Sequence, residues 1–198
     1  MRLILLRHGE STWNAQGRMQ GTADPPLSDA GRAQARALAP LLAGLEPDAV
    51  VTSDLRRARQ TADELGLAAA EPDPRWREAG LGRWVGRLVD EVVAEGPDNH
   101  DGGLEGSAAP PGGEAFADTC VRVAAAIGAL ASRAERALVV THGGPIRAAC
   151  ATAAGLPRSG LVAVPTASLT EIAVPDGGPG WVVAFGVTAR GAVRPAPP

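Results

Sequence analysis

The sequence predicts an α/β protein, a three-layer α/β/α sandwich with a mostly parallel central sheet. Short apolar runs at residues 2–6, 48–52 and 137–140 suit strands that are buried on both faces. Segments with apolar residues at helical spacing alternate with these runs. A length of 198 residues allows a sizeable core. This alternation of strand and helix favours helices packed on both faces of one sheet.

Local signals place the first two helices. Ser28 is the expected N-cap of the first helix, and Pro40 lies within its apolar stripe, so this helix should kink or end early. The second helix follows the second strand, with Ser53 or Asp54 as its expected N-cap and Gly66 at its end. A loop that contains Gly, Asn and Gln separates the first strand from the first helix.

The second half of the chain continues the pattern. Residues 95–113 are rich in Gly, Pro, Asp and Ala and are expected to form a long loop. A helix is predicted over 114–133, and Pro145 at a first-turn position opens the next helix. Two closing strands, 167–173 and 181–187, are expected on either side of a Gly-rich turn.

We expect a single domain over residues 1–190. Within it, residues 79–112 would shape the entrance to a substrate site, and residues 191–198 would be a disordered tail rich in Pro and Ala. The two cysteines, Cys120 and Cys150, fall on apolar faces of predicted helices. This position favours two buried thiols over a disulfide or a metal site.

Composition argues for a small-molecule partner. The net charge of −3 creates no field that would attract nucleic acid or an anionic membrane. The apolar run at the N-terminus is interrupted by Arg7 and is too short for a signal peptide or a membrane span, so we expect a cytoplasmic location. Both a monomer and a homodimer remain open.

Two of the three histidines stand in matching positions. His8 and His142 each follow an apolar strand and precede glycine, about 134 positions apart. In open α/β sheets, ligands bind where parallel strands end. We therefore expect both imidazoles to face one crevice, which points to chemistry on a substrate.

The Arg7-His8-Gly9 segment has the composition of a phosphoryl-transfer site. A neutral imidazole is a competent nucleophile toward phosphorus and can form a covalent intermediate. An adjacent guanidinium matches phosphoryl oxygens. Gly9 allows close approach of the backbone to a ligand. The alternative is a buried, hydrogen-bonded core histidine beside a surface arginine.

Further donors follow along the chain. Asn14, Gln20 and Gly21 can present N–H groups to an anion. Arg56 and Arg57 occupy the first turn of a helix, where cations oppose the macrodipole, and a bound anion would explain their position. A solvated basic face is the alternative.

Taken in order, the segments 7–14, 53–58 and 141–144 closely resemble motifs of the histidine phosphatase superfamily, also called the phosphoglycerate mutase-like family. The resemblance spans roughly residues 1–187. It implies a phosphoglycerate mutase-like fold and a metal-independent phosphatase that hydrolyses a small phosphorylated metabolite, a phosphomonoester, through a phosphohistidine intermediate.

The resemblance also implies roles for individual residues. His8 would be the nucleophile, and Arg7, Arg57 and His142 would line the phosphate pocket. The motif position favours Arg57 over its neighbour. Glu78 matches the family's proton donor, which would protonate the leaving oxygen and then activate water.

The remaining expected substrate contacts are Asn14, Gln20, Gly21 and Gly143. For the predicted acid, Glu78, the alternative is an ion pair with Arg77 or Arg83 at the surface. One departure from the family is the sequence Trp84-Val85-Gly86, where members often carry a glutamate in the middle. This puts a substrate role at that position in doubt.

No cluster of His, Cys, Asp or Glu has metal-ligand spacing, so neither a metal nor another cofactor is expected. The runner-up activity is a phosphoglycerate mutase, in which a substrate hydroxyl instead of water receives the phosphoryl group. Residues 88–113 contain no Lys or Arg, which disfavours this, although Arg83 and Arg87 remain candidate cations. A third alternative is a catalytically silent regulatory binding protein. His100, in a polar loop, is expected to be solvated.

Overall fold

The computed structural model describes residues 1–96, 109–157 and 161–192. At its centre is a seven-stranded sheet in the order β3-β2-β4-β1-β5-β6-β7. Strands β3, β2, β4 and β1 form a parallel block, and β5, β6 and β7 extend it in antiparallel pairing. The strands are β1 (Arg2–Arg7), β2 (Ala49–Thr52), β3 (Glu71–Pro72), β4 (Arg136–Thr141), β5 (Ser168–Ala173), β6 (Trp181–Thr188) and β7 (Gly191–Ala192).

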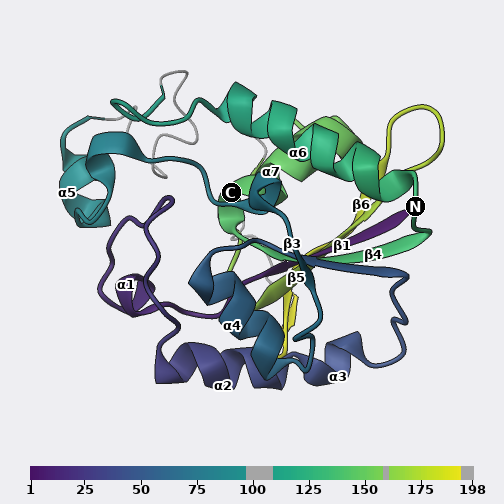
Figure 1. Cartoon of the computed structure of the whole chain (residues 1–198). Coiled ribbons are helices and arrows are strands. Elements are labelled where there is room, and N and C mark those ends of the chain that lie inside the picture. The colour runs from purple at the N-terminus through teal and green to yellow at the C-terminus, as the bar shows by residue number, and fades with distance from the viewer. Residues whose placement is uncertain (97–108, 158–160, 193–198) are drawn as a thin grey trace.

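Helices cover both faces of this sheet, which confirms the predicted three-layer sandwich (Figure 1). Helices α2, α3 and α4 lie on one face, and α6 and α7 lie on the other. Two short helices, α1 and α5, lie to one side of the sheet. The helices are α1 (Thr12–Ala15), α2 (Asp29–Ala37), α3 (Ala39–Leu42), α4 (Arg56–Glu64), α5 (Val89–Ala94), α6 (Phe116–Ala131) and α7 (Gly143–Ala154).

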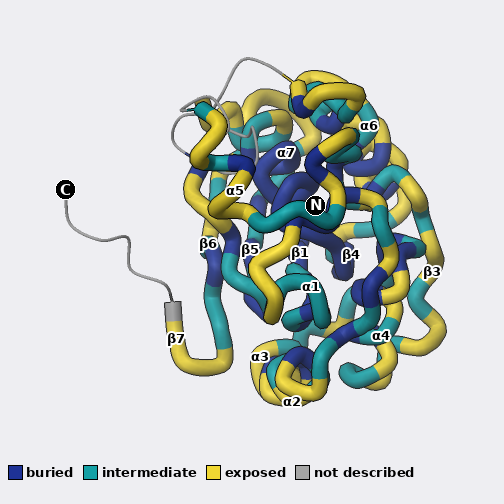
Figure 2. The backbone as a smooth tube through the Cα atoms, turned by 90° about the vertical axis from the view of Figure 1, so that its left-hand side faces the viewer, coloured by how far each residue is buried: buried dark blue, intermediate teal, exposed yellow. Residues whose placement is uncertain are grey.

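Strand β1 supplies both core layers. Leu3 and Leu5 pack in the cluster under α6 and α7, while Ile4 and Leu6 pack in the cluster under α2 and α4. All four side chains are buried, and each contributes about 2 kcal/mol of hydrophobic free energy. Figure 2 shows the same burial along β4 and α7. The apolar run of β1 therefore reflects a strand with helices on both faces.

The predicted start and break of the first helical segment are confirmed. Ser28 is the N-cap of α2, and its hydroxyl accepts a hydrogen bond from Gly31 N–H. The chain leaves α2 at Leu38, and α3 begins directly afterwards with Pro40 in its first turn. Proline fits there because the first N–H groups of a helix have no partner within it.

The predicted N-cap of the next helix is wrong. The N-cap residue of α4 is Leu55, and no side chain at that position caps the helix. Ser53 instead hydrogen-bonds His142, and Asp54 forms an ion pair with Arg77. Both polar side chains thus have tertiary partners, which local sequence cannot reveal.

Helix α6 is shorter than the range predicted for it. Glu114 lies before its first turn, because the carboxylate accepts Gly80 N–H and pairs with Arg122.

Pro145 lies in the first turn of α7, as predicted. The five predicted strands match β1, β2, β4, β5 and β6 to within one residue at each end. Short elements were missed: α1, α5, β3, β7 and the 3-10 turns Pro74–Trp76 and Gly82–Trp84.

Some expectations concern residues outside the described ranges. His100, most of the predicted 95–113 loop and most of the predicted tail belong to them. Cys150 is buried as expected, but Cys120 is only partly buried, at the edge of the core cluster under α6. No helix in the described ranges is long and apolar enough to cross a membrane.

Candidate active site

The site lies at the carboxyl ends of β1 and β4. These strands are parallel neighbours, with Arg7 opposite Thr141, and His8 N–H donates to Thr141 O at 2.9 Å. The next residues are therefore adjacent, and the His8 and His142 rings have centroids 5.0 Å apart. The two loops that match in sequence thus meet at one edge of the sheet.

His8 is held as a neutral imidazole by hydrogen bonds at both ring nitrogens. Its Nδ1 lies 2.6 Å from Gly9 O and must donate to it, so Nδ1 carries the proton. The other nitrogen, Nε2, accepts from Arg57 Nε at 3.3 Å. Burial, together with the charges of Arg57 and Arg7, lowers the pKa of His8 well below 6.5. A lone pair on Nε2 therefore faces the guanidinium at neutral pH.

Two buried guanidinium groups surround this imidazole. Arg57 is 1% exposed, and burial lowers its pKa to about 10. Arg7 donates to Val164 O, while its Nε is buried without a hydrogen-bond partner among the described residues. Burial also lowers the pKa of Arg7, and the nearby charge of Arg147 acts in the same direction. Buried cations that repel one another favour a bound anion.

Arg57, the arginine chosen from the motif, is the buried member of its pair. Its Nη1 and Nη2 donate to the carbonyls of Ala23 at 2.7 Å and Gly21 at 2.9 Å. The neighbouring Arg56 is exposed on the surface of α4. The guanidinium of Arg57 is thus fixed in orientation before any ligand arrives.

His142 lies behind His8. It is fully buried, and its Nε2 is 2.8 Å from Ser53 Oγ. Its Nδ1 has no hydrogen-bond partner within the described ranges. Burial, and next the charge of Arg57, lowers the pKa of His142 well below 6.5. Two neutral imidazoles thus stand beside two guanidinium groups.

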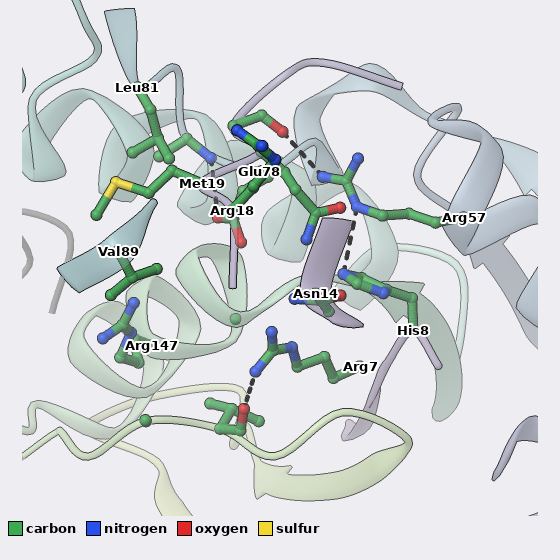
Figure 3. Close-up of a pocket in the computed structure, with 16 residues that line it drawn as sticks. Arg7, His8, Asn14, Arg18, Met19, Arg57, Glu78, Leu81, Val89 and Arg147 are labelled. Carbon is green, nitrogen blue, oxygen red and sulfur yellow. Dashed lines mark hydrogen bonds between the residues drawn. The ribbon is translucent and has the colours of Figure 1, made fainter. Parts of the chain in front are cut away.

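Glu78 is fixed at the start of α7. Its Oε1 accepts the N–H groups of Gly144 at 3.0 Å and Ala79 at 2.9 Å. A Cβ at Gly144 would lie 2.2 Å from this oxygen, so only glycine leaves room for the carboxylate. The alternative ion pair with Arg77 does not form, because Arg77 binds Asp54. Glu78 instead faces the same cavity as His8 (Figure 3).

That cavity has a volume of about 290 Å³. The predicted site residues in its wall are Arg7, His8, Asn14, Gln20, Gly21, Arg57, Glu78 and Gly143. His142, predicted to line the phosphate pocket, is not among the described residues of this wall, and its ring instead contacts that of His8.

The two amides in the wall, Asn14 and Gln20, have their side-chain oxygens engaged within the protein. Ser11 hydrogen-bonds the side-chain oxygens of both. The amide nitrogens therefore remain as donors for a ligand. By contrast, Gly9 serves packing rather than the ligand: a Cβ there would lie 2.3 Å from Gly31 O, at the close approach to α2.

Two further cations, Arg18 and Arg147, line the cavity, although neither is among the site residues predicted from the sequence. Arg147 lies one helical turn after Gly143 in α7. A cation near the N-terminus of a helix opposes the helix macrodipole, and the same signal singled out Arg57. Apolar side chains complete the wall: Met19, Leu81 and Val89 lie together on one side of the cavity (Figure 3), and Val164 also lines it.

The departure at Trp84-Val85-Gly86 lies outside the cavity wall. Trp84 is buried against Met19 and Val92. Val85 is partly exposed to solvent and Gly86 N–H donates to Met19 O. The valine at position 85, where family members often have glutamate, therefore lies in a turn outside the pocket, so this departure removes no side chain from the cavity wall.

We expect an anion to stabilise the protein through Arg57. Orthovanadate or phosphate at about 100 times its Kd should raise the free energy of unfolding by about 2.7 kcal/mol. Arg57→Met should lose most of this stabilisation, because the buried guanidinium is gone, whereas Arg56→Met should keep it. Thermal unfolding with and without the anion measures both. Equal shifts in the two variants would contradict an anion site at Arg57.

Acidification below about pH 6.5 should lower the free energy of unfolding of the ligand-free protein. Both buried histidines have a lowered pKa, so the unfolded chain binds more protons there and stability falls as the pH falls. The slope is about 1.4 kcal/mol per pH unit for each histidine. His142→Gln should roughly halve it between pH 6.5 and 5, as measured by urea unfolding. An unchanged slope in this variant would show that His142 does not titrate in this way.

A family model described as the histidine phosphatase superfamily (branch 1) matches residues 3–186. A glucosyl-3-phosphoglycerate phosphatase of Mycolicibacterium vanbaalenii is 41% identical over 169 residues, which cover 79% of this chain and 75% of that protein. A probable phosphoglycerate mutase of Photorhabdus laumondii is 33% identical over 164 residues, with 79% of this chain and 76% of that protein covered.

Among solved structures, the mycobacterial glucosyl-3-phosphoglycerate phosphatase in complex with VO3 superposes with a TM-score of 0.79. The two chains are 36% identical, and the match covers 87% of this chain and 92% of that one.

Proposed function

The chain belongs to branch 1 of the histidine phosphatase superfamily, and we propose that it hydrolyses a small phosphorylated metabolite, a phosphomonoester, through a phosphohistidine on His8. The observation that carries the assignment of His8 is the position of its Nε2. This atom is unprotonated and lies 3.3 Å from Arg57 Nε, and His8 is part of the cavity wall. A nucleophile is thus placed where a buried cation would hold the phosphoryl group.

In the first step, His8 Nε2 attacks phosphorus and the bond from phosphorus to the ester oxygen breaks. Arg7 and Arg57 bind the phosphoryl oxygens and offset their charge in the transition state. Glu78 acts as the general acid and gives a proton to the departing oxygen, so an alcohol leaves. The bond from His8 Nδ1–H to Gly9 O stabilises the positive charge that the ring acquires.

In the second step, water attacks the phosphohistidine. Glu78, now a carboxylate, takes a proton from this water, and the P–N bond breaks to release inorganic phosphate. His8 returns to its neutral form. Charge is offset by guanidinium groups at every step, so the scheme requires no metal.

Hydrolysis is supported by the positions of Arg83 and Arg87, the two cations that the sequence offers for a mutase, although Arg18 and Arg147 do line the cavity. Arg83 and Arg87 are not in the cavity wall, and Arg87 forms an ion pair with Glu95. A mutase must bind a second, strongly anionic substrate group. The similarity to a probable phosphoglycerate mutase keeps this reaction as the second candidate.

The deciding experiment is a panel of phosphorylated metabolites, with p-nitrophenyl phosphate, assayed for phosphate release with and without EDTA. We expect release that EDTA does not reduce. Interconversion of phosphoglycerates that depends on a bisphosphate primer, without net phosphate release, would instead establish the mutase. No turnover of any ester and no labelled phosphate on His8 would favour a silent binding protein.

We further propose a cytoplasmic protein that acts on small metabolites rather than on nucleic acid or membranes, as a monomer or a homodimer. The net charge of −3 supports this choice of partner. Residues 1–190 would form one domain, with residues 79–112 at the substrate entrance; Ala79, Leu81 and Val89 of this region line the cavity.

A further inference from the structure

Helix α4 carries Arg57, yet it has no N-cap from its own segment. The N-cap residue, Leu55, has no acceptor in its side chain. The first N–H groups of a helix need acceptors from outside the helix. One of them, Arg56 N–H, donates to Asp24 Oδ1 at 2.6 Å. A carboxylate from 32 residues earlier in the chain thus caps the helix.

Asp24 belongs to the loop that also holds the guanidinium of Arg57. The carbonyls of Gly21 and Ala23 accept from its Nη2 and Nη1, at 2.9 and 2.7 Å. Its third polar atom, Nε, donates to His8 Nε2. The segment 21–24 therefore contacts both the start of α4 and the far end of the Arg57 side chain.

These hydrogen bonds connect the segment 21–24 to α4 at two points. The Asp24 carboxylate ties the loop to the backbone of α4, and two loop carbonyls tie it to the guanidinium. If the cap were lost, the loop carbonyls could move relative to the helix, and the guanidinium would lose its orientation toward His8. The negative charge of Asp24 also raises the pKa of Arg57, which opposes part of the lowering by burial.

We propose that Asp24 is a positioning residue that caps α4 and thereby holds Arg57 against His8 Nε2. The inference rests on the proposed function, in which Arg57 binds the phosphoryl group. Asp24 is exposed and lies outside the cavity wall, so it acts through Arg57 rather than on the substrate.

The competing explanation is that Asp24 stabilises α4 without affecting the site. Asp48 provides a matched control for it. This aspartate is also exposed, and its carboxylate accepts the N–H groups of Glu135 at 3.0 Å and Arg136 at 2.8 Å. It caps the start of β4, at the opposite end of the sheet from His8.

The test compares Asp24→Ala, Asp24→Asn and Asp48→Ala with the unchanged chain. Thermal unfolding, the Kd for orthovanadate and kcat for p-nitrophenyl phosphate are measured well below the unfolding midpoint. We expect Asp24→Ala to weaken orthovanadate binding by about fivefold and to lower kcat similarly. Asp24→Asn should restore both, because an amide oxygen also caps a helix. Asp48→Ala should lower the midpoint without changing Kd or kcat.

An Asp24→Ala variant with unchanged Kd and kcat would overturn the inference, as would an equal loss in Asp48→Ala. A chain that binds orthovanadate but hydrolyses no ester would contradict the proposed function and leave the Kd comparison as the test of Asp24. Absence of orthovanadate binding in the unchanged chain would refute the phosphate site and the inference with it.

Discussion

His8→Ala should reduce turnover by at least about 1,000-fold, which corresponds to about 4 kcal/mol of transition-state stabilisation. The reason is that Nε2 of this ring is the atom proposed to bond to phosphorus, and no neighbouring group can replace it. His142 cannot substitute, because its Nε2 bonds Ser53 and its ring lies behind His8. Steady-state hydrolysis of p-nitrophenyl phosphate measures the loss.

A labelling experiment separates loss of the nucleophile from loss of the fold. Rapid quenching of the enzyme with a phosphate-labelled ester should trap label on the unchanged chain but not on His8→Ala. The label should survive alkali and be lost in acid, as expected for a P–N bond. The variant should keep its helical circular dichroism. Activity within about tenfold of the unchanged chain would exclude covalent catalysis by His8.

Glu78→Gln should slow esters of basic alcohols by about 100-fold or more. An alkoxide is a poor leaving group and needs a proton, whereas p-nitrophenolate leaves without one. We therefore expect only a small loss of the phosphorylation rate with p-nitrophenyl phosphate. The amide oxygen that this substitution introduces can still accept the N–H groups of Gly144 and Ala79, so the local structure should be kept. Single-turnover rates with an alkyl phosphate and with p-nitrophenyl phosphate test the difference.

Glu71→Gln is a suitable control for this substitution. Glu71 is an exposed carboxylate that pairs with Arg133 and lies outside the cavity wall. Its loss should change neither rate. Equal slowing of both esters by Glu78→Gln would mean that Glu78 positions the phosphoryl group instead of donating a proton.

Local sequence was sufficient for several elements whose stabilising interactions are local. The apolar run of β1 identified a strand buried on both faces, because side chains alternate between two core clusters. Ser28 and Pro40 identified the start and break of a helical segment, because capping and the missing proline N–H act within one turn. Ordered motifs also placed eight residues of the cavity wall.

Local sequence failed where the partner is distant. Ser53 and Asp54 were predicted to cap α4, but they bond His142 and Arg77. Arg147 has a local signal, its place near the start of α7, but whether it enters the cavity wall depends on how α7 packs. The short helices α1 and α5 are too brief to leave a periodic signal.

The sequence alone determined that this chain is an α/β protein with an imidazole and arginines at strand ends, because the order of apolar runs and motifs is written along the chain. Only the tertiary structure decided which arginine is buried, which nitrogen of His8 is unprotonated and what holds Glu78. Those properties arise from contacts such as Arg57 to His8, between residues 49 positions apart, and burial and hydrogen bonding at such distances exist only in the folded chain.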